Sequence, residues 1–422
     1  MMQGEIITTG TELITGQTAD SNAGYIARRL HEAGLTAARL TTVGDQSPLI
    51  REVLEAGLGR SRFIIITGGL GPTEDDVTVP AAALALDRRL VIHAGLLERI
   101  RRCLGERRIP WAERYASLAL IPEGAQLLDP GGMACGFALT HRGVRLFFLP
   151  GVPQEMRHLF DHIVPPALVA WAGPGEAWAR RTLRFFGIAE GQLEEVISRL
   201  PDFDAGVTVG FYPHFPETHL SLTVRGADRE TLEAILDSLT AILAEAVGEH
   251  LLGPDTVTLE ELVGRYLNTR KLTLAVAESC TGGLIGHRLT DVAGASDYFL
   301  GGVVSYSNDA KCNLLGVPAA VLARHGAVSP ETARDMAQGV RKAFHAAVGL
   351  AVTGIAGPSG GSPEKPVGTV YIALATDQGE EVCHYQFYGN REEIKILTAE
   401  TALDQLRREL KSGQLSAVSG QL

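Results

Sequence analysis

Short apolar runs that end in loops rich in glycine, threonine and proline constrain this sequence more than any other feature. The clearest example is the run Phe63-Ile-Ile-Ile-Thr67, which continues directly into Gly68-Gly-Leu-Gly-Pro-Thr73. An unbroken apolar run of this length is typical of a strand that is buried on both faces. Such strands belong mostly to parallel sheets covered by helices, where ligand-binding loops follow the carboxyl ends of the strands.

The N-terminal part of the chain repeats this pattern. We expect strands over residues 6–9, 39–43 and 63–67. We also expect one helix capped by Asp20 or Ser21, and another that Ser47 caps with Pro48 at its first position. The resulting βαβαβ order predicts a parallel sheet with ligand loops at one edge.

The rest of the chain divides into two further regions. A glycine- and proline-rich stretch over residues 172–176 is typical of a linker, and Gly253-Pro254 marks a second break. The fold class is therefore α/β, with two α/β domains joined by a small α+β domain that is interpreted as a spacer or dimerisation module. The predicted domains span residues 1–172, 177–252 and 256–412.

Composition excludes several classes of protein. The 422 residues carry a formal net charge of -11, which argues against nucleic acid or an anionic membrane as the main partner. The five cysteines form no C-x-x-C pair, so neither a zinc site nor a disulfide framework is expected. Without an apolar run long enough to span a bilayer or a basic-then-apolar leader, a cytoplasmic location is expected.

Ser279 lies where a predicted strand over residues 272–277 gives way to a helix. Such a junction exposes a side chain and directs unpaired backbone N–H groups toward it. Ser279 can therefore attack a carbonyl group while the N–H groups around Thr281, Gly282 and Gly283 stabilise the oxyanion. The simpler alternative is that Ser279 only caps the helix.

A serine nucleophile needs a base, and Tyr306 and Lys311 lie at the end of another predicted strand. A lysine with a lowered pKa can accept the serine proton directly or through the tyrosine hydroxyl, as in known Ser-Lys variants of the catalytic triad. Which residue accepts the proton stays open, as does the view that Tyr306 is a core residue and Lys311 a solvated charge. Cys280 is a rival nucleophile, although its acidic neighbour Glu278 opposes thiolate formation.

A third loop follows a predicted strand over residues 349–353. Its hydroxyl and glycines, among them Thr353, Gly354 and Gly357, suit a phosphate or a ribose, and Lys365 brings a second cation to the loop. A plain turn is the alternative for a glycine-rich loop.

Five motifs occur in order between residues 277 and 371: A-E-S-C-T-G-G, G-G-V-V-S-Y-S-N-D-A-K, G-A-V-S-P-E-T-A, T-G-I-A-G-P-S-G-G and K-P-V-G-T-V-Y. This set resembles the nicotinamide-nucleotide amidohydrolase domain of the competence/damage-inducible CinA proteins. The resemblance implies metal-free hydrolysis of nicotinamide mononucleotide to nicotinate mononucleotide and ammonia. It implies that Ser279 is the nucleophile and that Tyr306 and Lys311 are its activating pair.

The N-terminal loops also suit a nucleotide. Glycines before a helix favour phosphate oxygens, whereas Glu74, Asp75 and Asp76 repel phosphate unless a cation intervenes, which suggests a metal-bridged phosphate. An acidic helix N-terminus is the alternative. Two further loops, from Thr9 to Glu12 and around Pro150, are expected at the same sheet edge. The predicted nucleotide-binding residues are Thr9, Gly10, Thr11, Gly68, Gly69, Gly71, Thr73, Pro150 and Gly151.

The motifs G-T-E-L, T-G-G-L-G-P-T-E-D-D-V-T and L-P-G-V-P-Q-E-M, between residues 10 and 156, resemble the molybdopterin-binding fold at the N-terminus of CinA proteins. In some members this domain is implicated in cleaving ADP-ribose with a divalent metal (Mg, Mn or Co) and potassium. By resemblance, Glu12, Asp75 and Asp76 are metal or phosphate ligands. The middle region resembles a KH-like linking domain, but it contains no G-x-x-G loop, which argues against RNA binding.

The sequence is thus interpreted as a nucleotide-recycling enzyme that deamidates nicotinamide mononucleotide and also binds or hydrolyses ADP-ribose. The resemblance further implies a homodimer. Two alternatives remain: a nucleotide-sensing interaction protein without turnover, and an enzyme related to pterin cofactors.

Overall fold

The structure is a computed structural model that describes residues 3–129, 136–172, 177–200, 203 and 206–412. The chain divides into two compact units, Met1–Glu176 and Ala177–Leu422. Each unit is described by itself below. Within the described residues, no helix has the length and apolar character needed to cross a membrane. Residues 173–176 of the predicted linker, and Cys135, lie outside the described residues.

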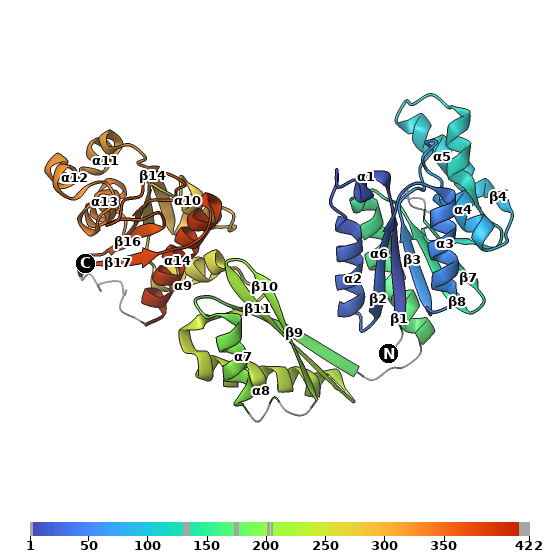
Figure 1. The fold of residues 1–422 in the computed structure, drawn as a ribbon, viewed down its shortest axis with the longest axis horizontal. Coiled ribbons are helices and arrows are strands. Elements are labelled where there is room, and N and C mark those ends of the chain that lie inside the picture. Colours follow the sequence, from blue (N-terminus) through green and yellow to red (C-terminus); the bar gives the residue numbers. More distant parts are fainter. Residues whose placement is uncertain (1–2, 130–135, 173–176, 201–202, 204–205, 413–422) are drawn as a thin grey trace. The chain divides into compact units, whose positions relative to one another are not determined.

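The first unit is a six-stranded sheet with helices on both faces (Figure 1). Its elements are β1 (Gln3–Thr9), α1 (Thr11–Ile14), α2 (Ser21–Glu32), β2 (Thr36–Val43), α3 (Ser47–Leu58), β3 (Phe63–Thr67), α4 (Thr78–Ala85), β4 (Leu90–Ile92), α5 (Ala94–Glu106), β5 (Leu120–Pro122), β6 (Gln126–Leu127), β7 (Phe137–His141), β8 (Val144–Leu149) and α6 (Pro153–Ala172).

The sheet has the strand order β2-β1-β3-β8-β7-β6, and its first four strands are parallel. All five residues of β3 are buried, as the apolar run predicts. Because side chains alternate along a strand, Phe63 and Ile65 pack under α2 and α6, while Ile64 and Ile66 pack under α3 and α4. The carboxyl ends of β1, β3 and β8 therefore meet at one edge, where the predicted nucleotide loops begin.

The helix caps show one success and one error of sequence reasoning. Asp20 caps α2 by accepting a hydrogen bond from the backbone N–H of Ala23. Ser47, however, is the first residue of α3 rather than its cap; Gln46 takes the cap position and makes no side-chain bond there. The backbone at Gln46 is extended, and the helix begins at Ser47, one residue earlier than a cap at Ser47 would place it.

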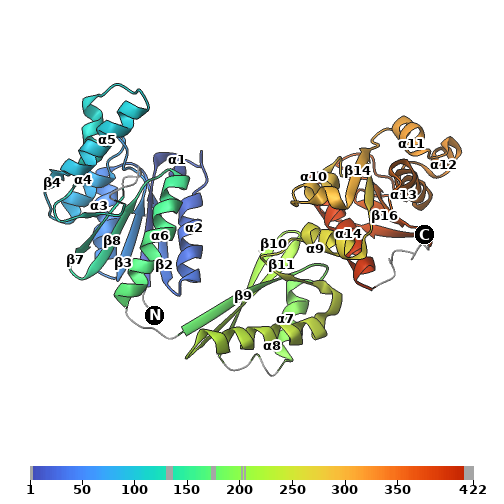
Figure 2. The ribbon, with the colours of Figure 1, turned by 180° about the vertical axis from the view of Figure 1, so that it is seen from behind.

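The second unit begins with a small antiparallel sheet of order β10-β11-β9-β12, covered on one face by α7 and α8 (Figure 2). Its elements are β9 (Ala177–Phe185), α7 (Glu190–Ser198), β10 (Val207–His214), β11 (Glu217–Gly226), α8 (Arg229–Val247) and β12 (Leu251–Pro254). Leucines spaced along one face of α8 pack on this sheet, which gives the predicted α+β region its own core.

A mixed five-stranded sheet of order β14-β13-β15-β16-β17 forms the remainder of the second unit. Its elements are α9 (Leu259–Arg270), β13 (Leu274–Glu278), α10 (Leu284–Thr290), β14 (Phe299–Val304), α11 (Asn308–Leu315), α12 (Ala319–His325), α13 (Pro330–Phe344), β15 (Val348–Gly354), β16 (Thr369–Ala375), β17 (Glu380–Gln386) and α14 (Arg391–Ser412).

The pairings of β13 with β14 and with β15 are parallel, and these three strands carry the three predicted loops at their carboxyl ends. Helices α9, α10 and α14 cover one face of this sheet, and α13 covers the other. The face under α13 is built from small residues such as Ala275 and Ala351. Close approach is required there, because a Cβ on Gly349 would lie 2.2 Å from the carbonyl oxygen of Ala337. The predicted α/β fold class with parallel-rich sheets and an intervening α+β region is confirmed.

Candidate active site and nucleotide loops

Ser279 and Lys311 form a buried pair in the second unit. Lys311 Nζ donates a hydrogen bond of 3.0 Å to Ser279 Oγ and one of 2.7 Å to the carbonyl oxygen of Ser305. Ser279 follows β13 and Lys311 lies in α11, which follows the neighbouring strand β14. Two adjacent parallel strands therefore bring residues 32 positions apart into contact.

The surroundings of Lys311 suit a base. The side chain is 1% exposed, and burial lowers the pKa of its amine below the ordinary lysine value. The rival nucleophile has the opposite character, since burial raises the pKa of the Cys280 thiol to about 12. A thiol that stays protonated is a poor nucleophile, so the geometry favours Ser279.

Glu278, which precedes the serine, occupies the N-terminus of α10. Its buried carboxylate accepts hydrogen bonds from the backbone N–H groups of Gly283, Ile285 and Gly286 and from the Thr281 hydroxyl, at 2.7 to 3.1 Å. A carboxylate at this position is favoured by the helix dipole. The N–H of Gly283 is therefore already engaged, and of the three groups expected around the oxyanion those of Thr281 and Gly282 remain candidates.

Tyr306 lies beyond the end of β14 and is 62% exposed. Its hydroxyl accepts a hydrogen bond of 2.9 Å from Arg391, the first residue of α14. Arg391 also donates to the carbonyl oxygen of Gly357 at 2.6 Å. Tyr306 is thus linked to the glycine-rich loop through an arginine, whereas Lys311 reaches Ser279 directly.

The glycine-rich loop is fixed against the segment that precedes α13. Lys365 Nζ donates to the carbonyl oxygens of His325 and Val328 at 2.8 and 2.6 Å, and the Thr353 hydroxyl donates to that of Ala327 at 2.7 Å. Both side chains therefore anchor the loop to that segment. Gly354 keeps the loop close to the nucleophile, because a Cβ there would lie 3.2 Å from Cys280 Sγ.

The three N-terminal loops meet as expected from the sheet order. A Cβ on Gly68 would lie 2.3 Å from the carbonyl oxygen of Thr9, and one on Gly151 would lie 3.3 Å from Gly68 Cα. The Thr9 and Thr78 hydroxyls are 3.0 Å apart, and a Cβ on Gly69 would collide with Thr78. Glycine is required at these positions because the loops touch one another there. Without side chains in the way, the backbone groups of the loops line the shared edge.

Other predicted residues of these loops have local partners. The N–H of Thr11 donates to Asp45 at 2.7 Å, and the N–H of Gly10 donates to the Val43 carbonyl at 3.0 Å. Asn22 donates to the Gly151 carbonyl at 2.9 Å, and the buried Pro150 carbonyl accepts the Thr67 hydroxyl at 2.7 Å. Among the described residues, Asn22 Oδ1 is a buried acceptor without a partner, so an acceptor is available beside this edge.

The acidic side chains of this region do not form a closed metal site. In the described residues, no group of three or more His, Cys, Asp or Glu side chains is placed to hold a metal ion. Asp76 accepts the N–H of Thr73 at 2.9 Å and its hydroxyl, both through Oδ2. Asp75 is exposed, and a hydrogen bond from Thr73 lowers its pKa. Glu12 is exposed in α1.

Comparison with known proteins identifies three family domains along the chain. Residues 256–410 match the CinA C-terminal domain, residues 5–170 the probable molybdopterin binding domain, and residues 180–253 the damage-inducible protein CinA KH domain. A CinA-like protein of Syntrophus aciditrophicus is 46% identical over 415 residues, which cover 97% of this chain and 98% of that protein.

The chain belongs to the CinA family.

A second relative also matches over nearly the whole chain. A CinA-like protein of Geobacter metallireducens is 42% identical over 97% of this chain and 100% of its own length. Among solved structures, the competence/damage inducible protein CihA from Agrobacterium tumefaciens is 45% identical, with a TM-score of 0.34; the match covers 36% of this chain and 95% of that one.

Two residues of this CinA chain were missed by sequence reasoning, Glu278 and Arg391. Glu278 had been considered only for its effect on a neighbouring thiol, although a carboxylate just before a helix is a signal for N-terminal capping. Arg391 opens a helix, where a cation is disfavoured by the dipole. A disfavoured charge at a helix start is the signal that could have identified it.

Proposed function

We propose that the C-terminal domain hydrolyses the amide of nicotinamide mononucleotide to nicotinate mononucleotide and ammonia. The observation that carries the proposal is the 3.0 Å hydrogen bond between Lys311 Nζ and Ser279 Oγ in a buried site that lowers the pKa of the lysine. A neutral amine at that distance is within reach of the serine proton. The proposal also draws on family membership, because the motifs around both residues are those that resemble the amidohydrolase.

The reaction follows from these positions. Neutral Lys311 takes the hydroxyl proton while Ser279 Oγ bonds to the amide carbon, and the carbonyl oxygen becomes an oxyanion beside the N–H groups of Thr281 and Gly282. When the carbon–nitrogen bond breaks, protonated Lys311 returns its proton to the leaving nitrogen, which departs as ammonia. Water then attacks the acyl-enzyme by the same route and releases the carboxylate product. Arg391 and Tyr306 flank the loop that would hold the nucleotide.

Ammonia release from nicotinamide mononucleotide tests this function. We expect Ser279→Ala to lower turnover at least about 10³-fold, because it removes the nucleophile. Cys280→Ala is the matched control, since it alters the adjacent buried side chain and should retain activity. Full activity in the Ser279→Ala variant would contradict the assignment. Absence of ammonia release by the wild-type protein would favour the nucleotide-sensing alternative.

For the N-terminal domain we propose binding of ADP-ribose at the edge formed by the loops of Thr9, Gly68 and Gly151, and hydrolysis of its pyrophosphate. Divalent cations such as Mg²⁺ are commonly held by one or two carboxylates together with substrate phosphates. Asp75 and Asp76 would hold such a cation. The cation would supply Lewis-acid polarisation of a phosphoryl oxygen, and potassium is a further proposed cofactor. The test is hydrolysis of ADP-ribose by Asp76→Asn, with Glu74→Gln as the control on the same loop.

A pterin is the second candidate ligand for this domain, because residues 5–170 match a family described as a probable molybdopterin binding domain. Thermal shifts of the full chain with ADP-ribose, AMP and a pterin would distinguish the candidates. A larger shift with the pterin would replace the ADP-ribose proposal. We further propose that the protein is a cytoplasmic homodimer that acts on small nucleotides and not on nucleic acid, and light scattering of the purified chain tests its oligomeric state.

A further inference from the structure

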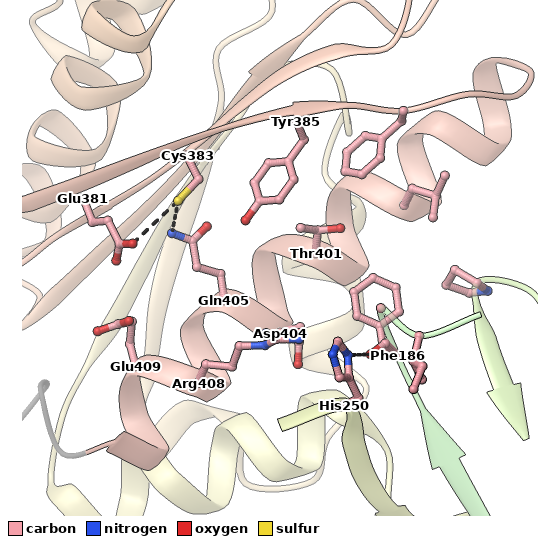
Figure 3. Close-up of a pocket in the computed structure, with 15 residues that line it drawn as sticks. Phe186, His250, Glu381, Cys383, Tyr385, Thr401, Asp404, Gln405, Arg408 and Glu409 are labelled. Atoms are coloured by element: carbon pink, nitrogen blue, oxygen red, sulfur yellow. Dashed lines mark hydrogen bonds and ion pairs between the residues drawn. The ribbon is translucent and has the colours of Figure 1, made fainter. Parts of the chain in front are cut away.

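A cavity in the second unit lies between α14, β17 and the region around β9 and β12, and Ser279 is not among the residues that line it (Figure 3). Its volume of about 640 Å³ falls in the range of small-molecule sites. Aromatic rings form part of its wall: Phe186, Tyr385 and Phe387 line it, and the last two are stacked with ring centres 5.6 Å apart. Such a wall favours a planar ligand.

The charged groups of the wall are mainly acidic. Glu381, Asp404 and Glu409 line the cavity, and the single lining arginine, Arg408, is already paired with Asp404 at 2.7 Å and with Glu249. Burial and the negative charge of Glu381 raise the pKa of Glu409. Carboxylates gathered at one end of an aromatic cavity favour a cation and disfavour phosphate-bearing ligands.

The neutral polar groups also present acceptors. The Cys383 thiol donates to Glu381, so its sulfur accepts from Gln405 Nε2 at 3.3 Å, which fixes the orientation of that amide. Gln405 Oε1 is then a buried acceptor without a partner among the described residues, on a side chain that is 8% exposed. His250 Nδ1 lies 3.0 Å from the Phe186 carbonyl, which can only accept, so the neutral ring keeps Nε2 as another acceptor.

We propose that this cavity is a further binding site, selective for planar heteroaromatic cations. Such a ligand would stack on the rings and donate an N–H group to Gln405, and its charge would be attracted by Glu381 and Glu409, which repel an anionic nucleotide. The site is therefore distinct in ligand chemistry from both nucleotide sites proposed above, and its existence does not depend on either of them.

The test is calorimetric titration of the full chain with 1-methylnicotinamide, a heteroaromatic cation, and with nicotinate, an anion on the same ring. We expect saturable binding of the cation and none of the anion. Glu381→Gln should weaken binding of the cation at least about fivefold, as expected for the loss of one cation–carboxylate attraction.

Glu380→Gln is the matched control. Glu380 precedes Glu381 in β17, so its side chain points to the opposite face, where it bonds to Gln338. This variant should bind the cation as the wild type does, and equal thermal midpoints would show that both variants are folded. The proposal is overturned by equal binding of nicotinate, by an unchanged affinity in Glu381→Gln, or by absence of saturable binding of the cation.

Discussion

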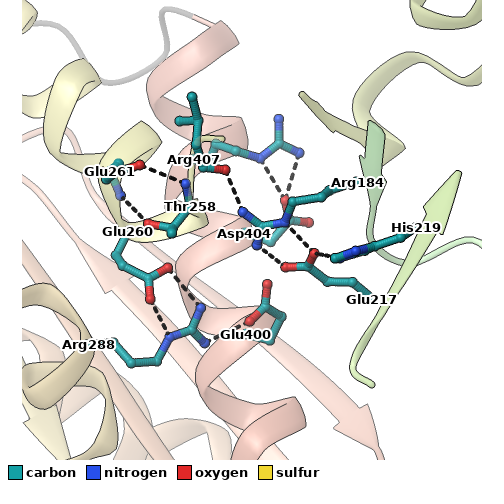
Figure 4. A network of polar contacts seen from close by, with 11 residues as sticks. Arg184, Glu217, His219, Thr258, Glu260, Glu261, Arg288, Glu400, Asp404 and Arg407 are labelled. Carbon is teal, nitrogen blue, oxygen red and sulfur yellow. Dashed lines mark hydrogen bonds and ion pairs between the residues drawn. The ribbon is translucent and has the colours of Figure 1, made fainter. Parts of the chain in front are cut away.

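A buried ionic cluster joins the small sheet of the second unit to α14 (Figure 4). We expect it to make the unfolding free energy of this unit depend on pH. Glu217 accepts two hydrogen bonds from Arg184 and one of 3.0 Å from His219. Glu400, 2% exposed, accepts a bond of 2.7 Å from Arg288 through Oε2, while its Oε1 is buried without a hydrogen-bond partner among the described residues. The negative charge of Glu217 also acts on Glu400, and two interacting buried carboxyl groups favour a state in which one of them is protonated.

The proton belongs mainly to Glu400. Burial raises the pKa of Glu400 to about 7 against the opposing charge of Arg288, and the charge of Glu217 adds to the increase. Burial also acts on Glu217, but the bonds from Arg184 hold the pKa of that residue below its ordinary value. Glu400→Gln is therefore informative, because an amide has the shape of the protonated acid and stays uncharged at every pH.

The magnitude follows from linkage. The pKa of Glu400 rises from 4.5 in the unfolded chain to about 7 in the folded protein, so the native state binds this proton more tightly. Its contribution to stability is complete below pH 4.5, declines as the pH rises, and is lost above about pH 7. A difference of about 2.5 pKa units corresponds to about 3 kcal/mol of unfolding free energy.

Hydrogen exchange of α14 amides in increasing urea measures the unfolding free energy of this unit. We expect Glu400→Gln to resemble the wild type near about pH 5 and to exceed it by about 3 kcal/mol near about pH 8.5. Glu392→Gln, an exposed change on the same helix, should follow the wild type at both values. If the difference between Glu400→Gln and the wild type were the same at both pH values, the reasoning would be refuted.

Four further predictions concern the candidate active site. Lys311→Arg should lower turnover of nicotinamide mononucleotide at least about 10³-fold, because a guanidinium stays protonated and cannot accept the serine proton. Since burial lowers the pKa of Lys311, kcat/KM of the wild type should rise with pH and level off below the ordinary lysine pKa; a rise only above that value would contradict a depressed base. Tyr306→Phe should leave this pH profile in place and cost less than about tenfold in kcat, since its hydroxyl bonds to Arg391; loss of the profile would make Tyr306 the base. Glu278→Gln should destabilise the second unit by about 3 kcal/mol in urea unfolding, because four donors lose a charged acceptor, and an unchanged midpoint would contradict that role.

Much of the site could be predicted from sequence because β13, β14 and β15 each end in a polar loop. Parallel strands bring their carboxyl ends to one edge of the sheet, so the sequence predicts that Ser279 and Lys311 lie close together. Periodicity does not give the direction of a long side chain, and it could not show that Lys365 turns toward two carbonyl groups. Nor could it place Arg391, which lies 85 positions from Tyr306 along the chain.

The role of Glu278 changes how charge is distributed in the proposed reaction. A helix N-terminus carries a partial positive charge that can stabilise an oxyanion, but Glu278 already neutralises that of α10 through three backbone N–H groups. Lys311 is buried and becomes positively charged only when it accepts the proton from Ser279. We infer that the oxyanion is stabilised mainly by a charge that appears on Lys311 as the oxyanion forms, so that the site favours the transition state more than the bound amide.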